Sequence, residues 1–142
     1  MSGAEHRLFV ARLDSLPETA SFVETFCVRN AFGREVMLRV TFIIEELFTN
    51  TVLHGYGADT DGPVRITLAA ESTEVVLIYE DAAPPYDPIA RWSDSPPNLA
   101  TPVECRAVGG LGVHIVSRFV TAARYAHEEG CNRLWLRVRC DG

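Results

Sequence analysis

Apolar residues recur three and four positions apart along one long stretch of the chain, residues 34–57. Such positions share one face of a helix with about 3.6 residues per turn, so the stretch predicts an amphipathic helix. The residues of the predicted buried stripe are Val36, Val40, Ile43, Ile44, Leu47 and Thr51. Gly55 and Gly57 predict the end of the helix, because glycine tolerates the left-handed conformation that often follows one.

Two polar residues, Glu46 and Asn50, lie four positions apart at the edge of this stripe, whereas Glu45 points almost the opposite way. A carboxylate and a carboxamide are costly to bury without partners. They therefore either hydrogen-bond to neighbouring backbone or line a cleft, and this segment alone leaves both interpretations open. His54 follows one turn later, and we interpret it as a structural residue near the helix end.

The other patterns predict shorter elements and, taken together, a fold class. These elements are an edge strand over residues 6–13, a helix over 16–33, strands over 64–71 and 74–81, a short helix over 109–120, and two final strands within 121–138. The strand over 74–81 is the most continuously apolar, which favours a central place in the sheet. Helices and strand pairs do not alternate one for one. We therefore expect an α+β fold, with a mixed, mostly antiparallel sheet covered on one face by about three helices.

Length and composition are those of one soluble globular domain, and we expect residues 1–142 to form it. Apolar residues make up 47% of the chain and charged residues 23%, and no apolar run approaches the ~20 residues of a membrane span. The N-terminus lacks a secretory pattern, so we expect a cytoplasmic protein without a membrane partner. The net charge of -6 argues against direct nucleic-acid binding, which needs a basic face.

The cysteines and the late arginines carry little chemistry by themselves. The four cysteines, Cys27, Cys105, Cys131 and Cys140, show no CxxC pairing and no nearby histidine set, which argues against a metal site. We interpret them as separate thiols, with Cys27 as a small core residue. Three arginines, Arg133, Arg137 and Arg139, lie on the last predicted strand and are interpreted as part of a solvated face.

Six of the eight prolines lie between residues 84 and 102. Proline at this density excludes helix interiors and central strands, so the segment is predicted to be a long loop. Loops of this length inside a small domain are usually functional lids or disordered segments.

Three glycines, Gly109, Gly110 and Gly112, open the helix predicted after this loop. Backbone amides at such a helix start can approach an anion closely, although the same pattern also fits a plain helix start with tight packing. Asp81, at the end of a strand, is equally compatible with a local turn cap. Together with Glu46 and Asn50, these are three polar sites distant in sequence, each able to serve one part of a nucleotide.

These sites lie in three segments that resemble the ordered boxes of GHKL-type ATP-binding domains. EELFTNTVLHGY is similar to the N box, EDAAPPYDP to the G1 box and GGLGVHIVSRFV to the G2 box. Among these domains, the chain most resembles the anti-sigma factor serine kinases of the RsbW type, from about Leu8 to Val138. The resemblance implies the two-layer Bergerat fold and binding of ATP with Mg²⁺.

The resemblance also implies a role for each matching residue. Asn50 would hold the Mg²⁺ that bridges the ATP phosphates, Glu46 would be the general base on a protein hydroxyl, and Asp81 would accept a hydrogen bond from the adenine amino group. The phosphate-binding residues would be Gly109, Gly110, Leu111 and Gly112, and the segment of about 92–108 would be the ATP lid, with Arg106 as a further phosphate contact.

One position departs from the family pattern, because Ala83 stands where glycine is usual after Asp81. A methyl group there would crowd the adenine, or would strain the backbone if the position required a positive φ. The departure therefore predicts weaker nucleotide binding at a site that includes Ala83.

The function implied by the resemblance is that of an ATP- and Mg²⁺-dependent serine/threonine protein kinase. It would phosphorylate a STAS-domain anti-sigma antagonist, sequester a sigma factor or an equivalent regulator, and form a homodimer through its first strand and helix. Two alternatives remain: a binding module of the same fold that acts by protein contact alone, favoured by Ala83, and a small ATPase without a protein acceptor.

Overall fold

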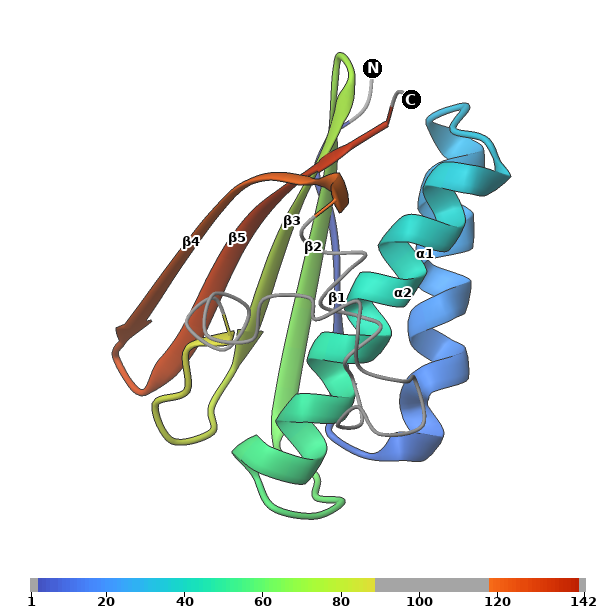
Figure 1. Ribbon diagram of the computed structural model, residues 1–142. Coiled ribbons are helices and arrows are strands. Elements are labelled where there is room, and N and C mark those ends of the chain that lie inside the picture. The colour runs from blue at the N-terminus through green and yellow to red at the C-terminus, as the bar shows by residue number, and fades with distance from the viewer. Residues whose placement is uncertain (1–2, 89–117, 141–142) are drawn as a thin grey trace, which may run out of the picture.

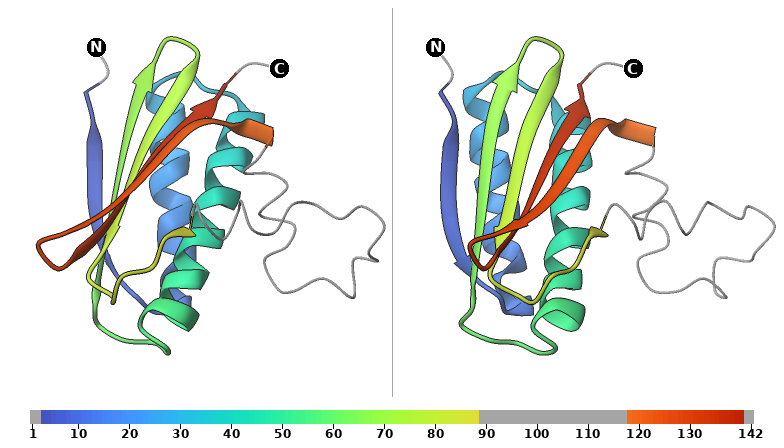
Figure 2. Two further views of the ribbon diagram at one scale, coloured as in Figure 1. Left: turned by 60° about the vertical axis from the view of Figure 1, so that its left-hand side comes forward. Right: turned by 90° about the vertical axis from the view of Figure 1, so that its left-hand side faces the viewer.

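The computed structural model describes residues 3–88 and 118–140, which form a two-layer α+β domain (Figure 1). Its elements are β1 (Glu5–Val10), η1 (Leu13–Ser15), α1 (Leu16–Arg29), α2 (Arg34–Asn50), η2 (Thr51–Gly55), β2 (Pro63–Glu71), β3 (Glu74–Asp81), β4 (Val120–Glu128) and β5 (Cys131–Arg139). Both α-helices cover the same face of the sheet, as the turned views show (Figure 2). The predicted fold class is confirmed. The helix predicted over residues 109–120 lies outside the described residues, except for its last three.

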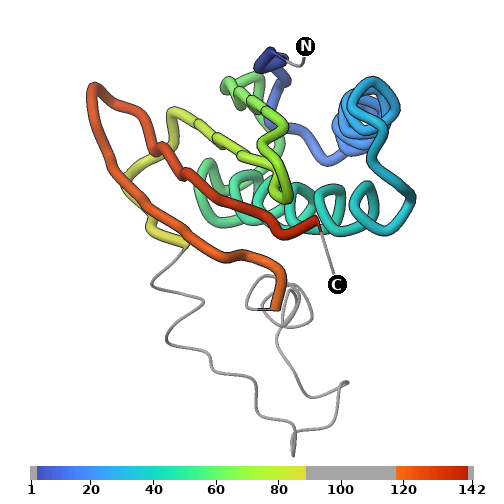
Figure 3. Tube along the Cα trace, turned by 90° about the horizontal axis from the view of Figure 1, so that it is seen from above, coloured from blue at the N-terminus to red at the C-terminus, as the bar shows by residue number. Residues whose placement is uncertain are grey.

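The five described strands form one sheet in the order β1-β2-β3-β5-β4. Seen from above, β1 and β4 lie at opposite edges of the curved sheet (Figure 3). The edge position of the first strand and the central position of the strand over 74–81 are both confirmed. Every described pair is antiparallel, and β2–β3 and β4–β5 are hairpins, which can only pair that way.

The core lies between the sheet and the two helices. Alternate residues of the sheet supply one side of it, namely Val64, Ile66, Leu68, Val75, Leu77, Tyr79, Leu134, Leu136 and Val138. The stripe predicted for α2 supplies the other side, and each of its residues is at most 6% exposed. Full burial of one such large apolar side chain stabilises the fold by roughly 1.5–3 kcal/mol, so this stripe fixes α2 against the sheet.

Cys27 of α1 belongs to the same core and is 1% exposed, as predicted. Its burial, together with the nearby Cys140, raises the pKa of the Cys27 thiol to about 11. The thiolate is the reactive form of cysteine, so this residue is chemically inert in the folded domain.

The outer face of the sheet carries arginines in ion pairs. Arg133 donates to Glu80 of the neighbouring strand β3 at 2.8 Å, and Arg137 donates to Glu71 at the end of β2, one strand further away, at 2.7 Å. These arginines are partly exposed, and the predicted solvated face is confirmed. The helices among residues 3–88 and 118–140 lack the length and apolar character that crossing a bilayer requires.

The long predicted helix ends in a wider turn. Regular α-helix stops at Asn50, and a π-helical turn, η2, continues the coil from Thr51 to Gly55. Single π turns of this kind often occur where a helix carries functional groups. Gly57, two residues beyond the turn, has a φ of 92° and reverses the chain toward β2. The sequence therefore predicts the helix and its end, although not the change of pitch at Thr51.

Candidate functional site

The C-terminal part of α2 presents two neighbouring stacks of side chains. Leu47 and Thr51, four residues apart, line a small cavity above the sheet. Glu46 and Asn50 each come one residue before Leu47 and Thr51. They form a second stack, rotated by about 100° around the helix axis from the first. Asn50 is buried, at 7% exposure, and Glu46 is half-buried. The carboxylate and carboxamide pair therefore lies beside the two helix residues that line the cavity, although it is not itself among the cavity's described walls.

Asp81 closes the cavity from the end of β3 and is held by three donors. Oδ1 accepts from Asn132 Nδ2 at 2.8 Å and from the Ala83 amide at 3.1 Å, and Oδ2 lies 2.9 Å from the Thr51 hydroxyl. A carboxylate can accept about four hydrogen bonds, so one further donor can be satisfied. The Ala83 contact is a local turn bond of the kind foreseen, and the other two tie Asp81 to α2 and β5.

The Thr51 hydroxyl links Asp81 to the core. It lies 2.7 Å from the Tyr79 hydroxyl and 3.0 Å from the Leu47 carbonyl, in addition to its contact with Asp81. A hydroxyl has one proton, and a charged acceptor is the stronger partner, so Thr51 donates to Asp81 and accepts from Tyr79. Burial raises the pKa of Tyr79 well above its ordinary value, which keeps this phenol a donor.

Asn132 and Thr51 are site residues that the sequence interpretation did not assign. Asn132 is the direct cross-strand partner of Asp81 in the β3–β5 register. A signal was present in the period-2 pattern: Asn132 begins the inward stripe that continues through Leu134, just as Asp81 ends the stripe that includes Tyr79. A polar residue at the end of each of two inward stripes indicates a polar site where those strands pair.

The cavity beneath Asp81 is small in this structure, about 20 Å³. Its walls are Leu47, Thr51, Tyr79, Asp81, Tyr86, Pro88, Tyr125, Asn132 and Leu134. This volume accommodates about one water molecule. Apolar and aromatic walls around one carboxylate suit a flat, mostly apolar ring bearing an amino group. Such a ring is larger than this space, so the walls would have to move apart for it to enter.

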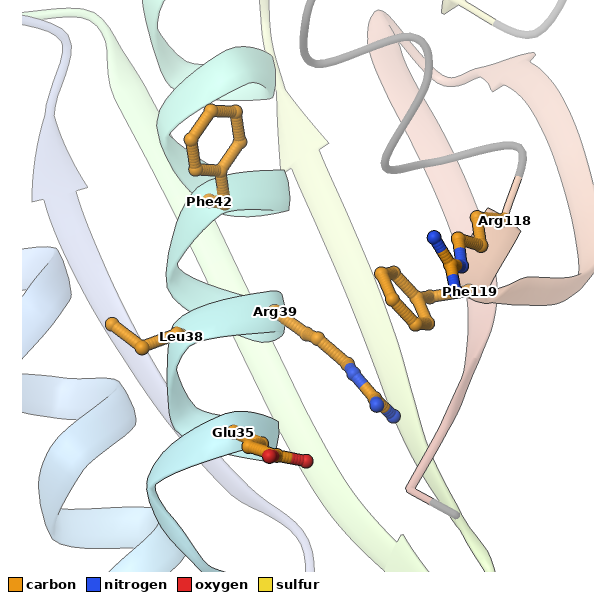
Figure 4. Close-up of a pocket in the computed structure, with 6 residues that line it drawn as sticks. All are labelled: Glu35, Leu38, Arg39, Phe42, Arg118 and Phe119. Carbon is orange, nitrogen blue, oxygen red and sulfur yellow. The ribbon is translucent and has the colours of Figure 1, made fainter. Parts of the chain in front are cut away.

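A second and larger hollow, about 410 Å³, opens beside the first half of α2 (Figure 4). It is lined by Glu35, Leu38, Arg39, Phe42, Arg118 and Phe119. The Arg39 guanidinium stacks over Phe119, 4.0 Å from the ring centroid, and donates to the Arg139 carbonyl at 2.9 Å. Among the residues that the structure describes, none lines both this hollow and the Asp81 cavity.

Comparison with known families assigns the chain to a family. The profile of the histidine kinase-like ATPase domain matches residues 9–138, which is most of the chain. The chain belongs to this family. An ATPase domain implies ATP binding. The chain is also 26% identical over 115 residues to the serine/threonine-protein kinase BtrW of Bordetella bronchiseptica, a stretch that covers 81% of this chain and 79% of the relative.

The remaining predicted site residues of this ATPase domain lie outside the described residues. They are Arg106, Gly109, Gly110, Leu111 and Gly112, with the predicted lid of about 92–108. Within residues 3–88 and 118–140, no three His, Cys, Asp or Glu side chains are grouped as metal ligands.

Ala83 does not cause the backbone strain that a required positive φ would have given. Its φ is not positive, so the alanine is unstrained, and it is absent from the walls of the Asp81 cavity. Its side chain, which is 2% exposed, packs instead against Gly55 in the π-helical turn. The expected backbone strain is wrong, because φ at this position is not positive. The expected crowding of the adenine stays a prediction. Ala83 contributes to the site through its backbone, and its contact with nucleotide stays a prediction.

This packing predicts a coupled effect of residues 55 and 83 on stability. A Cβ added at Gly55 would lie 3.1 Å from the Ala83 Cβ, closer than ordinary van der Waals contact. In the wild-type background, this overlap opposes the roughly 1 kcal/mol that alanine gains over glycine in a helix. In an Ala83→Gly background the overlap is gone. Gly55→Ala should therefore be more favourable there by about 1 kcal/mol or more, measured by urea unfolding.

A matched control uses another glycine. Gly33, before α2, has no atom within 4 Å of the place that an added Cβ would occupy, and Gly33→Ala should give the same change in unfolding free energy in both backgrounds. Equal effects of Gly55→Ala in the two backgrounds would show that the close approach of residues 55 and 83 does not influence stability.

Proposed function

We propose that this ATPase domain is an ATP- and Mg²⁺-dependent serine/threonine protein kinase and a partner-switching regulator. Its substrate would be a STAS-domain anti-sigma antagonist, and its second partner a sigma factor or an equivalent regulator. The observation that carries the proposal is the pairing of two stacks on α2: Leu47 and Thr51 face the Asp81 cavity, while Glu46 and Asn50 flank it. The similarity to a protein described as a serine/threonine-protein kinase supports the choice of acceptor.

The adenine ring would lie in the enlarged Asp81 cavity, with its amino group donating to the carboxylate. Thr51, Asn132 and the Ala83 amide already hold that carboxylate in one orientation. The ring would replace the water-sized space and contact the apolar walls Leu47 and Leu134. The Asp81 carboxylate can only accept hydrogen bonds. It therefore favours a base that presents an amino group over one that presents a carbonyl group at the same position.

The phosphates would extend from this cavity along the side of α2 that carries Asn50 and Glu46. The Asn50 amide oxygen would hold Mg²⁺, which when bound neutralises phosphate charge. Gly109, Gly110, Leu111, Gly112 and Arg106 are proposed to contact the phosphates. Glu46 lies one turn before Asn50, about 6 Å along the helix, and would therefore be near the far end of a nucleotide whose base contacts Asp81.

Phosphoryl transfer would then proceed in line from ATP to the partner's hydroxyl. The hydroxyl oxygen forms a new bond to the γ-phosphorus, the bond from that phosphorus to the β–γ bridging oxygen breaks, and ADP leaves. Glu46 accepts the proton released by the hydroxyl. The role of the remaining residues is to position the reactants and neutralise charge, which are the main requirements of this reaction.

The test is transfer of label from γ-labelled ATP to purified STAS-domain proteins of the same organism. Label on a serine or threonine of one partner, lost when Mg²⁺ is chelated, is the expected result. Binding of ATP without transfer to any partner would support the binding-module alternative. Phosphate release without a partner would support the simple ATPase. Either result would contradict the kinase assignment.

The binding-module alternative has less support than the sequence suggests. It rests on Ala83, and the methyl group of Ala83 faces Gly55 rather than the cavity. Glu46 and Asn50, which a pure binding module would not need, lie beside the cavity that would bind the base. Their presence therefore favours the kinase.

We also propose that the kinase is a homodimer that associates through β1 and α1. β1 is an edge strand with Leu8 60% exposed and Val10 41% exposed, and Val28 on α1 is 73% exposed. Exposed apolar side chains on an unpaired strand edge favour association with another chain.

A further inference from the structure

The side chain of Asn132 hydrogen-bonds to Asp81 and also to four other groups around the cavity. Its Nδ2 donates to Asp81 Oδ1 at 2.8 Å and to the carbonyls of Ala83 and Pro84, each at 3.0 Å. Its Oδ1 accepts from the Tyr86 amide at 3.1 Å and from the Tyr125 hydroxyl. One buried side chain on β5 thus joins the end of β3, the turn that follows it, and β4.

The chemistry of these partners requires a carboxamide. Asp81, Ala83 and Pro84 present only acceptors to Asn132, whereas Tyr86 and Tyr125 present donors. Asparagine supplies an amino group toward the first set and an oxygen toward the second. Aspartate would lack the donors, and an apolar residue of the same size would leave the buried groups unpaired, which is costly.

The contact with Asp81 also limits how that carboxylate can turn. Asn132 and the Ala83 amide occupy Oδ1, and Thr51 occupies one side of Oδ2. The remaining acceptor position of Asp81 is therefore aimed in one direction. A carboxylate that is held in this way cannot rotate away when a base such as guanine presents a carbonyl group in place of the amino group. The repulsion between the carboxylate oxygen and the carbonyl oxygen then disfavours that base.

We propose that Asn132 is a specificity-determining positioning residue: it fixes the Asp81 carboxylate and the turn from Ala83 to Tyr86, and thereby sets the preference for an amino-bearing purine. The inference rests on the proposed binding of the base at Asp81. Asn132 acts through Asp81 and the turn, and not by contact with the phosphates. Its loss should therefore weaken base recognition and leave the reaction step at Glu46 intact.

The experiment compares Asn132→Ser with wild type in the dissociation constants of ATP and GTP. Serine is smaller, and water can fill the space, so the fold should persist, which a thermal unfolding scan checks. We expect about tenfold weaker ATP binding, the effect of losing one hydrogen bond to a charged group. The preference for ATP over GTP should fall by a similar factor. The rate of phosphoryl transfer at saturating ATP should stay within about twofold.

The matched control is Asn30→Ser, at an asparagine whose Nδ2 caps the Phe26 carbonyl at the end of α1, away from the cavity. It should leave both nucleotide constants unchanged. A second test variant, Asn132→Asp, keeps the size of the side chain but places a carboxylate against Asp81, and it should lose ATP binding more completely.

The outcomes separate this inference from the proposed function. Wild-type protein that binds neither ATP nor GTP would contradict nucleotide binding itself, and the inference would fall with it. Wild-type protein that prefers ATP, with folded Asn132 variants that keep the same ATP affinity and the same preference, would overturn only the role of Asn132. A fall in stability without any change in the ATP-to-GTP ratio would also overturn it, because that result indicates a purely structural residue.

Discussion

Glu46→Gln should reduce phosphoryl transfer to the partner protein by about 10²–10⁴-fold, the usual contribution of a general base. Glutamine has the same size but cannot take the proton of the acceptor hydroxyl. ATP binding should change little, because the base-binding groups lie on the neighbouring stack of α2 and on β3 and β5. The measurement is the single-turnover rate of label transfer, with the ATP dissociation constant determined on the same preparation.

The helix supplies its own control for this experiment. Glu45 is the adjacent residue and is exposed on the side of α2 that faces away from the buried stripe. Glu45→Gln therefore makes the same chemical change at a position away from the core. It should leave transfer within about twofold of wild type, since exposed charges contribute little. Equal transfer rates in the Glu46 and Glu45 variants would rule out Glu46 as the base.

Asp81→Asn should weaken ATP binding by about a hundredfold or more. The three groups that hold Asp81 all donate to it, and the adenine amino group would be a fourth donor. An amide has one acceptor oxygen, and its amino group would face donors, leaving at least one buried group unpaired. Transfer should fall in parallel at low ATP. Titration of a fluorescent ATP analogue, with competition by ATP, measures the affinity.

The same substitution should also lower the free energy of unfolding by roughly 1–3 kcal/mol, because the lost bonds connect α2, β3 and β5. Asp14→Asn, at an exposed carboxylate of η1, is the matched control and should change neither quantity. Retained ATP affinity in a folded Asp81→Asn protein would place the base elsewhere and would remove the main support for the proposed site.

The helices and strands could be predicted from the sequence because the spacing of apolar residues in each one repeats for long enough to be recognised. The inward stripe of α2, from Val36 to Thr51, and the alternation in β3 needed no knowledge of their neighbours. Glu46, Asn50 and Asp81 could be singled out for the same reason. Each is a polar residue that interrupts, borders or ends an apolar pattern.

Contacts between elements could not be predicted in this way. That Asn132 faces Asp81 depends on the register between β3 and β5, which are separated by a long segment, and no turn fixes that register. The partnership of Thr51 with Asp81 depends on how α2 lies across the sheet. The contact of the Ala83 methyl group with Gly55 could not be predicted for a similar reason, since it joins residues distant in sequence.

The hairpin arrangement of the sheet has a consequence for folding. β2–β3 and β4–β5 each join near neighbours in sequence, whereas the hydrogen bond between Asp81 and Asn132 joins residues 51 positions apart. Local contacts form early and long-range contacts form only after the cost of closing a long loop is met. We therefore expect the Asp81 cavity to be completed when the two hairpins dock along β3 and β5. A nucleotide bound where β3 meets β5 would stabilise the contacts that form last during folding. Its main kinetic effect would therefore be to slow unfolding.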